Sequence, residues 1–99
     1  MFEIRRDESG LIVLRGRLDA AQATKAEAVL AALTAPATVD FGALEYVSSA
    51  GLAVLLKAQK RLVANSGRGL RLVNMNRHIH EIFRYAGFDQ IFEIDAHSP

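Results

Sequence analysis

The sequence has 99 residues, of which 51% are hydrophobic and 23% charged, and its formal net charge is +1. This length and composition are typical of one globular domain with its own core, and they argue against a disordered chain. The chain has no cysteine, which excludes disulfides and thiolate chemistry, and its scattered charges form no nucleic-acid-binding patch. The N-terminus lacks the apolar centre of a signal peptide, and no apolar run approaches the roughly 20 residues of a membrane span. We therefore expect a cytoplasmic protein without direct membrane insertion or nucleic-acid binding.

Two paired strands are the first elements that the sequence predicts. Residues 2–6 (FEIRR) alternate apolar and charged side chains, as a half-exposed strand does. Residues 11–16 (LIVLRG) are more apolar and predict a more buried strand. The intervening DESG supplies turn-forming residues, which favours a hairpin.

A helix is predicted to follow this hairpin. Asp19 is expected to be its N-cap, and residues 20–33 are rich in alanine and other strong helix formers. The apolar positions that recur at helical spacing and should face the core are Ala23, Ala26, Val29, Leu30 and Leu33. Residues 37–41 (ATVDF) then predict a short third strand, with residues 42–47 as the connection beyond it.

A second helix is predicted from near Ser49 to about Asn65, followed by a turn and a fourth strand at residues 70–74. One side of this helix carries the apolar residues Leu52, Leu55, Leu56, Leu62 and Val63. The other side carries Lys57, Lys60 and Arg61, which predict a solvated face or the rim of a binding surface.

The last predicted elements are a third helix and a short strand. Asn74 or Asn76 can cap this helix, and its inward residues are expected to be Ile79, Ile82, Phe83 and Ala86. Gly87 is expected to adopt the left-handed conformation after the helix, with Phe88 folding back onto Phe83. Residues 91–94 predict a final strand, and residues 95–99 a frayed tail.

This order of elements predicts an α/β domain. Strands that alternate with helices favour a small mixed, largely parallel sheet, here of four to five strands with an N-terminal antiparallel hairpin and about three packed helices. The sequence contains no internal repeat, low-complexity segment or linker. We therefore expect a single domain over residues 1–99, with its core at about 2–94.

Most candidate reactive groups have simpler explanations. His78 and His80 are two residues apart on a predicted helix and cannot bind one metal ion from the same face. A serine hydrolase would need Ser49 with Asp89 and His97, but Val47 replaces the first glycine of the G-x-S-x-G pattern, and nothing is predicted to hold His97 in place. We therefore expect no enzymatic activity, no metal and no cofactor.

The adjacent serines Ser48 and Ser49 stand where a loop is predicted to lead into the second helix. Such a pair could cap the helix, supply a nucleophile or accept a phosphate. The residue pattern alone favours the cap by roughly four to one.

Longer stretches of the sequence carry a family resemblance. The stretch VDFGALEYVSSAGLAVLLKAQKRL, followed by GLRLVNMNRHIHEIFRYAGFDQIFEI, resembles the STAS domain family, and within it bacterial anti-sigma factor antagonists. GRLDAAQATKAEAVLAAL is similar to the G-x-L-D step into the family's first helix. The resemblance covers about residues 4–94 and implies a small mixed sheet with helices packed against it.

The resemblance also implies a function. A family member binds an anti-sigma factor that is a serine kinase, releases the sigma factor, and is switched off when that kinase phosphorylates it; a phosphatase resets it. The residues matching the acceptor motif make Ser49 the expected phosphorylation site, with Ser48, in place of the family's aspartate, as the second candidate. The implied partner-binding residues are Asp19, Glu45, Tyr46, Ser48, Ser49, Ala50, Gly51 and Leu52. The alternative is a STAS subunit of an ABC-type membrane transport complex that binds an ABC ATPase without a phosphorylation switch; in either case we expect a monomer or weak dimer.

Overall fold

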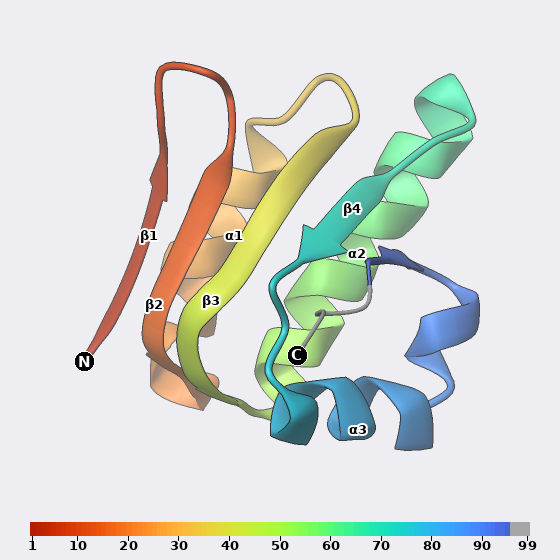
Figure 1. The fold of residues 1–99 in the computed structure, drawn as a ribbon. Helices are drawn as coiled ribbons and strands as arrows, with labels where there is room; N and C mark the ends of the chain where they lie inside the picture. The colour runs from red at the N-terminus through yellow and green to blue at the C-terminus, as the bar shows by residue number, and fades with distance from the viewer. Residues whose placement is uncertain (96–99) are drawn as a thin grey trace.

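A five-stranded sheet with the strand order β1-β2-β3-β4-β5 forms the centre of the protein in a computed structural model, which describes residues 1–95 (Figure 1). The strands are β1 (Phe2–Arg6), β2 (Ile12–Leu18), β3 (Ala37–Val47), β4 (Leu70–Val73) and β5 (Glu93–Ile94). β1 is antiparallel to β2, and all other neighbours are parallel. The predicted α/β class, with its hairpin and largely parallel sheet, is confirmed.

Two of the three helices cover one face of this sheet. α1 (Ala23–Ala31) and α2 (Ser49–Ser66) lie behind the strands in Figure 1, and α3 (Arg77–Tyr85) lies at the end where β3 leads into α2. The core between sheet and helices is a single cluster that includes Leu14, Leu30, Phe41, Leu55 and Leu72. Within residues 1–95, no helix is long and apolar enough to cross a membrane.

The β1–β2 turn is stabilised by Asp7. Its carboxylate accepts hydrogen bonds from the Ser9 N–H at 2.9 Å, the Ser9 hydroxyl at 2.6 Å and the Leu11 N–H at 3.0 Å. Because the Ser9 hydroxyl bonds the charged form, it lowers the pKa of Asp7 below its ordinary value of 3.8. The hairpin predicted from DESG is confirmed.

The first predicted helix is divided into two parts. Asp19 accepts the Gln22 N–H at 3.2 Å and so caps a short 3-10 helix over Ala20–Gln22, which leads directly into α1. α1 ends at Ala31, two residues before the predicted end. At its C-terminus, the Arg61 guanidinium of α2 donates to the Leu30 carbonyl at 3.1 Å and the Leu33 carbonyl at 2.8 Å.

β3 is longer than predicted. Residues 42–47, expected to be a connection, continue the strand, because Ala43, Leu44, Tyr46 and Val47 pair with the last residues of β2. The pairing of β2 with β3 contains two register shifts. Glycine has a low strand propensity, but the burial of Leu44 and Val47 against the core outweighs it at Gly42.

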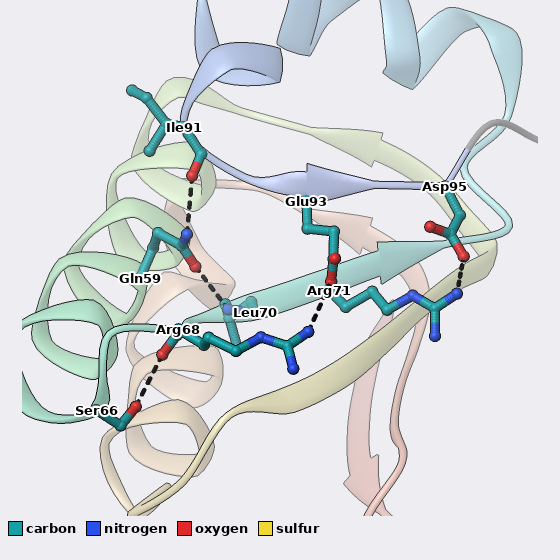
Figure 2. A network of polar contacts seen from close by, with 8 residues as sticks. All are labelled: Gln59, Ser66, Arg68, Leu70, Arg71, Ile91, Glu93 and Asp95. Atoms are coloured by element: carbon teal, nitrogen blue, oxygen red, sulfur yellow. Dashed lines mark hydrogen bonds and ion pairs between the residues drawn. The ribbon is translucent and has the colours of Figure 1, made fainter.

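α2 follows its predicted bounds but not its predicted face. Leu55 and Leu62 are buried as expected, whereas Val63 is 41% exposed, which corrects the prediction that it faces the core. The buried stripe instead includes Gln59, whose amide donates to the Ile91 carbonyl at 2.8 Å and accepts the Leu70 N–H at 2.6 Å (Figure 2). Gln59 thus connects α2 to β4 and to the segment that precedes β5.

α3 is capped by Asn76, which accepts the Ile79 N–H at 2.9 Å; Asn74, the other candidate, has left-handed backbone with φ 59°. Ile79 and Phe83 are buried as predicted, but Ala86 is exposed, because the helix ends at Tyr85 and the chain turns away. The prediction that Ala86 faces inward is therefore wrong.

The chain after α3 closes over an aromatic cluster. Gly87 has the predicted left-handed conformation, with φ 77°, and the Phe88 ring lies 6.2 Å from that of Phe83. β5 contains only Glu93–Ile94, since Ile91 and Phe92 precede the paired residues. In the predicted tail, the Asp95 N–H donates to the Leu72 carbonyl at 3.0 Å, and residues 96–99 lie outside the described part.

Candidate functional site

The two adjacent serines lie at the junction between β3 and α2, and Ser48 is built into that junction. Its N–H donates to the Leu18 carbonyl at the end of β2, and its carbonyl accepts the Leu52 N–H, both at 2.9 Å. Its hydroxyl accepts the Gly51 N–H at 3.2 Å, so Ser48 is the N-cap of α2. One serine of the pair therefore has the structural role that the residue pattern favoured.

Ser49 has a different environment. It is the first residue of α2 and is exposed, whereas Ser48 is half-buried. The capping hydrogen bond to the Gly51 N–H belongs to Ser48, so stabilising the helix does not require the Ser49 hydroxyl. The structure thus separates the two serines into a structural hydroxyl and an accessible one.

Gly51 allows the first turn of α2 to pack closely against the sheet. A Cβ atom added to Gly51 would lie 2.7 Å from Leu18 Cγ and 3.0 Å from Val47 Cγ2, closer than carbon atoms approach without displacement. A side chain at this position would therefore push the turn outward. The backbone after Ser48 and Ser49 thus packs directly against Leu18 of β2 and Val47 of β3.

The other residues named from the sequence lie around this turn. Asp19 directly follows Leu18, whose carbonyl accepts the Ser48 N–H. Glu45 and Tyr46 lie in the last part of β3, which pairs with β2. Glu45 is exposed, Tyr46, Ala50 and Leu52 are half-buried, and Gly51 is buried. The sequence-derived candidates therefore come together at one end of the sheet, although Gly51 contributes only by its packing.

Arg17 belongs to this region and was not identified from the sequence. It pairs with Tyr46 across β2–β3, and its guanidinium carbon lies 4.4 Å from the centre of the Tyr46 ring. Cations at this distance over an aromatic face are attracted by the ring. The alternating segment that ends in RGRLD could have indicated an exposed arginine beside Asp19, but not its stacking partner.

The start of α2 carries the partial positive charge of a helix N-terminus. Its first turn contains no acidic residue, so no side-chain charge there offsets the partial positive charge of the free N–H groups. A negative group attached to Ser49 would lie close to these N–H groups. The arrangement is suited to carry a phosphate at the helix N-terminus.

Other chemistries have little support at this site. Among residues 1–95, no three His, Cys, Asp or Glu side chains are placed to hold a metal ion. Asp89 lies in the short 3-10 helix after α3, and His97, the third residue of the hydrolase alternative, lies outside the described residues. A hollow of about 580 Å³ lies at the opposite end of the sheet, between the β1–β2 turn, Pro36 and the start of β4.

Comparison with known proteins gives consistent matches over nearly the whole chain. The family model described as "Mlab, STAS domain" matches residues 1–93. BtrV of Bordetella bronchiseptica, described as an anti-sigma factor antagonist, is 38% identical over 85 residues, which are 82% of this chain and 72% of BtrV.

Solved structures show the same fold. The crystal structure of an anti-sigma factor antagonist from Mycobacterium paratuberculosis has a TM-score of 0.76 at 21% identity, covering 98% of this chain and 86% of that one. SpoIIAA, also an anti-sigma factor antagonist, matches in its unphosphorylated form with a TM-score of 0.72 at 19% identity, covering 97% of this chain and 89% of SpoIIAA. The phosphorylated form of SpoIIAA, from Bacillus, matches with a TM-score of 0.66, again at 19% identity, covering 97% and 92%.

Proposed function

This chain belongs to the STAS domain family, and on that premise we propose that it is an anti-sigma factor antagonist whose binding to a cognate anti-sigma factor is switched off by phosphorylation of Ser49. The description of BtrV, the relative at 38% identity, supports the antagonist function. The existence of SpoIIAA in unphosphorylated and phosphorylated forms supports a covalent switch on this fold. The proposed partners are an anti-sigma factor that acts as a serine kinase and a phosphatase that reverses the modification.

One observation supports Ser49 over Ser48 as the phosphate acceptor: the two serines have different structural roles. A kinase must bring the acceptor hydroxyl to its bound nucleotide, which an exposed side chain permits. Ser49 is exposed, whereas the Ser48 hydroxyl accepts the Gly51 N–H and is half-buried. The Ser48 hydroxyl is already engaged in the helix cap and is less accessible, so Ser49 is the proposed acceptor and Ser48 the second candidate.

The size of the electrostatic effects indicates how the switch acts. A phosphate adds about −1.5 to −2 charges, and at a helix N-terminus a negative charge stabilises by about 0.3–1 kcal/mol. Reversing a strongly biased two-state equilibrium needs about 5.5 kcal/mol, which is far more than this stabilisation. Burying the same charge unpaired in an interface costs several kcal/mol. The phosphate therefore prevents docking and leaves the fold unchanged.

The proposed docking surface is the end of the sheet around Ser49. Its exposed and half-buried members are Asp19, Glu45, Tyr46, Ser48, Ser49, Ala50 and Leu52, with Gly51 beneath them. Of the three basic residues on α2, Lys57 pairs with Glu27 at 2.8 Å, and Arg61 donates to the Leu30 and Leu33 carbonyls. Lys60 is therefore the one of the three that we propose as a contact for the partner at the rim of this surface.

Recovery of the partner and mapping of the phosphate test the proposal. The tagged protein should recover a small kinase-like anti-sigma factor, and incubation with that kinase and ATP should place phosphate on Ser49, as read by mass spectrometry. Ser48→Ala is the matched control and should still be labelled, whereas Ser49→Ala should not. Ser49→Asp should bind the anti-sigma factor more weakly than Ser49→Ala does.

The alternative function gives a different result in the same experiment. A STAS subunit of an ABC-type transport complex would recover an ABC ATPase, and neither serine would be labelled. Ser48, the N-cap of α2, stands where the family's motif has an aspartate, and the first turn of the helix contains no acidic residue; this lack of a carboxylate supports the alternative.

A further inference from the structure

β1 forms one edge of the sheet, and half of its backbone groups point away from β2. β1 pairs only with β2 among the described strands, in a regular register from Phe2↔Gly16 to Arg6↔Ile12 (red strand in Figure 1). The Arg17 N–H donates to the Met1 carbonyl and the Asp7 N–H to the Leu11 carbonyl, each at 2.9 Å. Since bonding alternates along an antiparallel pair, the odd-numbered residues of β1 bond β2 and the even-numbered residues point outward.

The outward edge is protected mainly by charge. Native proteins blunt edge strands with charged side chains, proline, bulges or a covering helix or loop. β1 carries Glu3, Arg5 and Arg6, but it contains no proline and its register with β2 has no shift. The covering group recorded within residues 1–95 is the Lys25 ammonium, which donates to the Phe2 carbonyl at 3.0 Å. The N–H and C=O groups of Ile4 and Arg6 remain oriented to accept another strand.

The charges on β1 match a second copy of the same strand in one register. If two β1 strands run antiparallel with Ile4 opposite Ile4, then Glu3 of each copy lies opposite Arg5 of the other. Shifting the register by one pair in either direction places Glu3 opposite Glu3 or Arg5 opposite Arg5, and like charges directly opposite are destabilising. Neither Glu3 nor Arg5 belongs to an ion pair recorded within the described residues, so both are available.

The hydrogen bonds and side-chain faces fit the same register. Ile4 would exchange both bonds with Ile4 of the second copy, and Phe2 would exchange bonds with Arg6, all through outward-pointing groups. Each Phe2 carbonyl has a second lone pair, so its bond to Lys25 can persist. The two Glu3–Arg5 contacts would form at non-hydrogen-bonded positions, where opposed side chains are closest. Ile4, which already packs against the core, would meet its counterpart on the helix-covered face.

We propose that β1 is a self-association edge: two copies of this protein pair antiparallel through β1, about a two-fold axis at Ile4, into one continuous ten-stranded sheet. β1 is separated from β3, which leads into α2, by the whole of β2. The dimer therefore leaves the serines at the start of α2 accessible, and this inference is independent of the proposed function.

Charge exchange at the paired positions tests the register. The unmodified protein should show a reversible monomer–dimer equilibrium in sedimentation velocity over a concentration series. Glu3→Arg and Arg5→Glu should each weaken self-association about tenfold, because each places two like-charged pairs opposite one another. An equimolar mixture of these two variants should form a heterodimer, and the double variant Glu3→Arg/Arg5→Glu should regain the homodimer.

Amide hydrogen exchange supplies a readout that does not depend on variants. At low concentration, Glu3 and Arg5 amides should be protected by β2 while Ile4 and Arg6 amides exchange rapidly. At high concentration, Ile4 and Arg6 should gain protection. The proposal is overturned if the protein remains monomeric at every concentration reached. It is also overturned if the charge variants dimerise as well as the parent, or if a dimer forms without protecting Ile4 and Arg6.

Discussion

Substitution of each of the two serines by alanine should affect different properties. Ser48→Ala removes the oxygen that accepts the Gly51 N–H at the start of α2. Loss of a serine N-cap costs about 0.5–2 kcal/mol and typically about 1 kcal/mol. For a domain of this size, a loss of 1 kcal/mol lowers the melting temperature by about 4–8 °C. Ser49→Ala removes an exposed hydroxyl, and such surface changes usually lie within about 0.5 kcal/mol of zero.

The two variants should be compared by urea denaturation at neutral pH and by labelling with the cognate kinase. We expect Ser48→Ala to lower the midpoint without changing the slope, since the surface exposed on unfolding is the same. It should still be phosphorylated. Ser49→Ala should keep the parent's midpoint and lose phosphorylation. Ser48→Asp is the matched control, because aspartate is an equally good cap and its charge adds about 0.3–1 kcal/mol at a helix N-terminus.

Equal destabilisation by the two alanine variants would refute the assignment of the cap to Ser48. Labelling of Ser49→Ala together with loss of labelling in Ser48→Ala would refute the assignment of the acceptor. The first result concerns stability and the second concerns labelling, so the structural and the functional parts of the reasoning can fail separately.

Three further changes have expected outcomes. Gln59→Met should lower the free energy of unfolding by about 1–3 kcal/mol in urea titration, because it leaves the buried Leu70 N–H and the part-buried Ile91 carbonyl without their partner. Gly51→Ala should lower it by about 1–3 kcal/mol, since the new Cβ would overlap Leu18. The pKa of Asp7 is lower in the folded state, so its contribution to stability is present above pH 3.8 and is lost as the pH falls through the folded pKa. The stability difference between the parent and Asp7→Asn should shrink over that range, as measured by urea titrations at a series of pH values.

Each of these expectations has a contrary result. A Gln59→Met protein as stable as the parent would mean that water or a shifted backbone satisfies both groups. A Gly51→Ala protein of unchanged stability would mean that the first turn of α2 can move outward without cost. A stability difference at Asp7 that is constant over pH 2–5 would mean that the Ser9 hydrogen bond does not distinguish the charged carboxylate.

Features fixed by neighbouring residues could be predicted from the sequence. The caps of the 3-10 helix and α3 depend on Asp19 and on Asn76, whose side chains reach N–H groups three residues ahead. The left-handed Gly87 after α3 has the same local origin. These contacts need no knowledge of the rest of the chain, so composition and spacing indicated them, although they left Asn74 and Asn76 as alternatives for the cap of α3.

Features fixed by distant residues could not be predicted in this way. Residues 42–47 were predicted as a connection, and it is their pairing with β2 that extends β3 through them. Gln59 has the composition of a surface residue, and its burial depends on groups in β4 and the segment before β5 that periodicity does not reveal.

The site shows the same limit. The sequence identified both Ser48 and Ser49, but the role of each depends on how the backbone turns at Ser48. Arg17 was missed because its stacking on Tyr46 joins two strands that are far apart in the chain.

The bonds from Arg61 to the end of α1 have a consequence for the order of folding. α1 has no basic residue in its last turn and no left-handed residue at its C-cap, Ala32. The carbonyls at this end instead accept hydrogen bonds from a guanidinium about 30 positions later in the chain. A nine-residue helix is too short to persist alone in water. α1 should therefore become stable only once α2 has docked beside it. We expect α2 to form before α1 during folding.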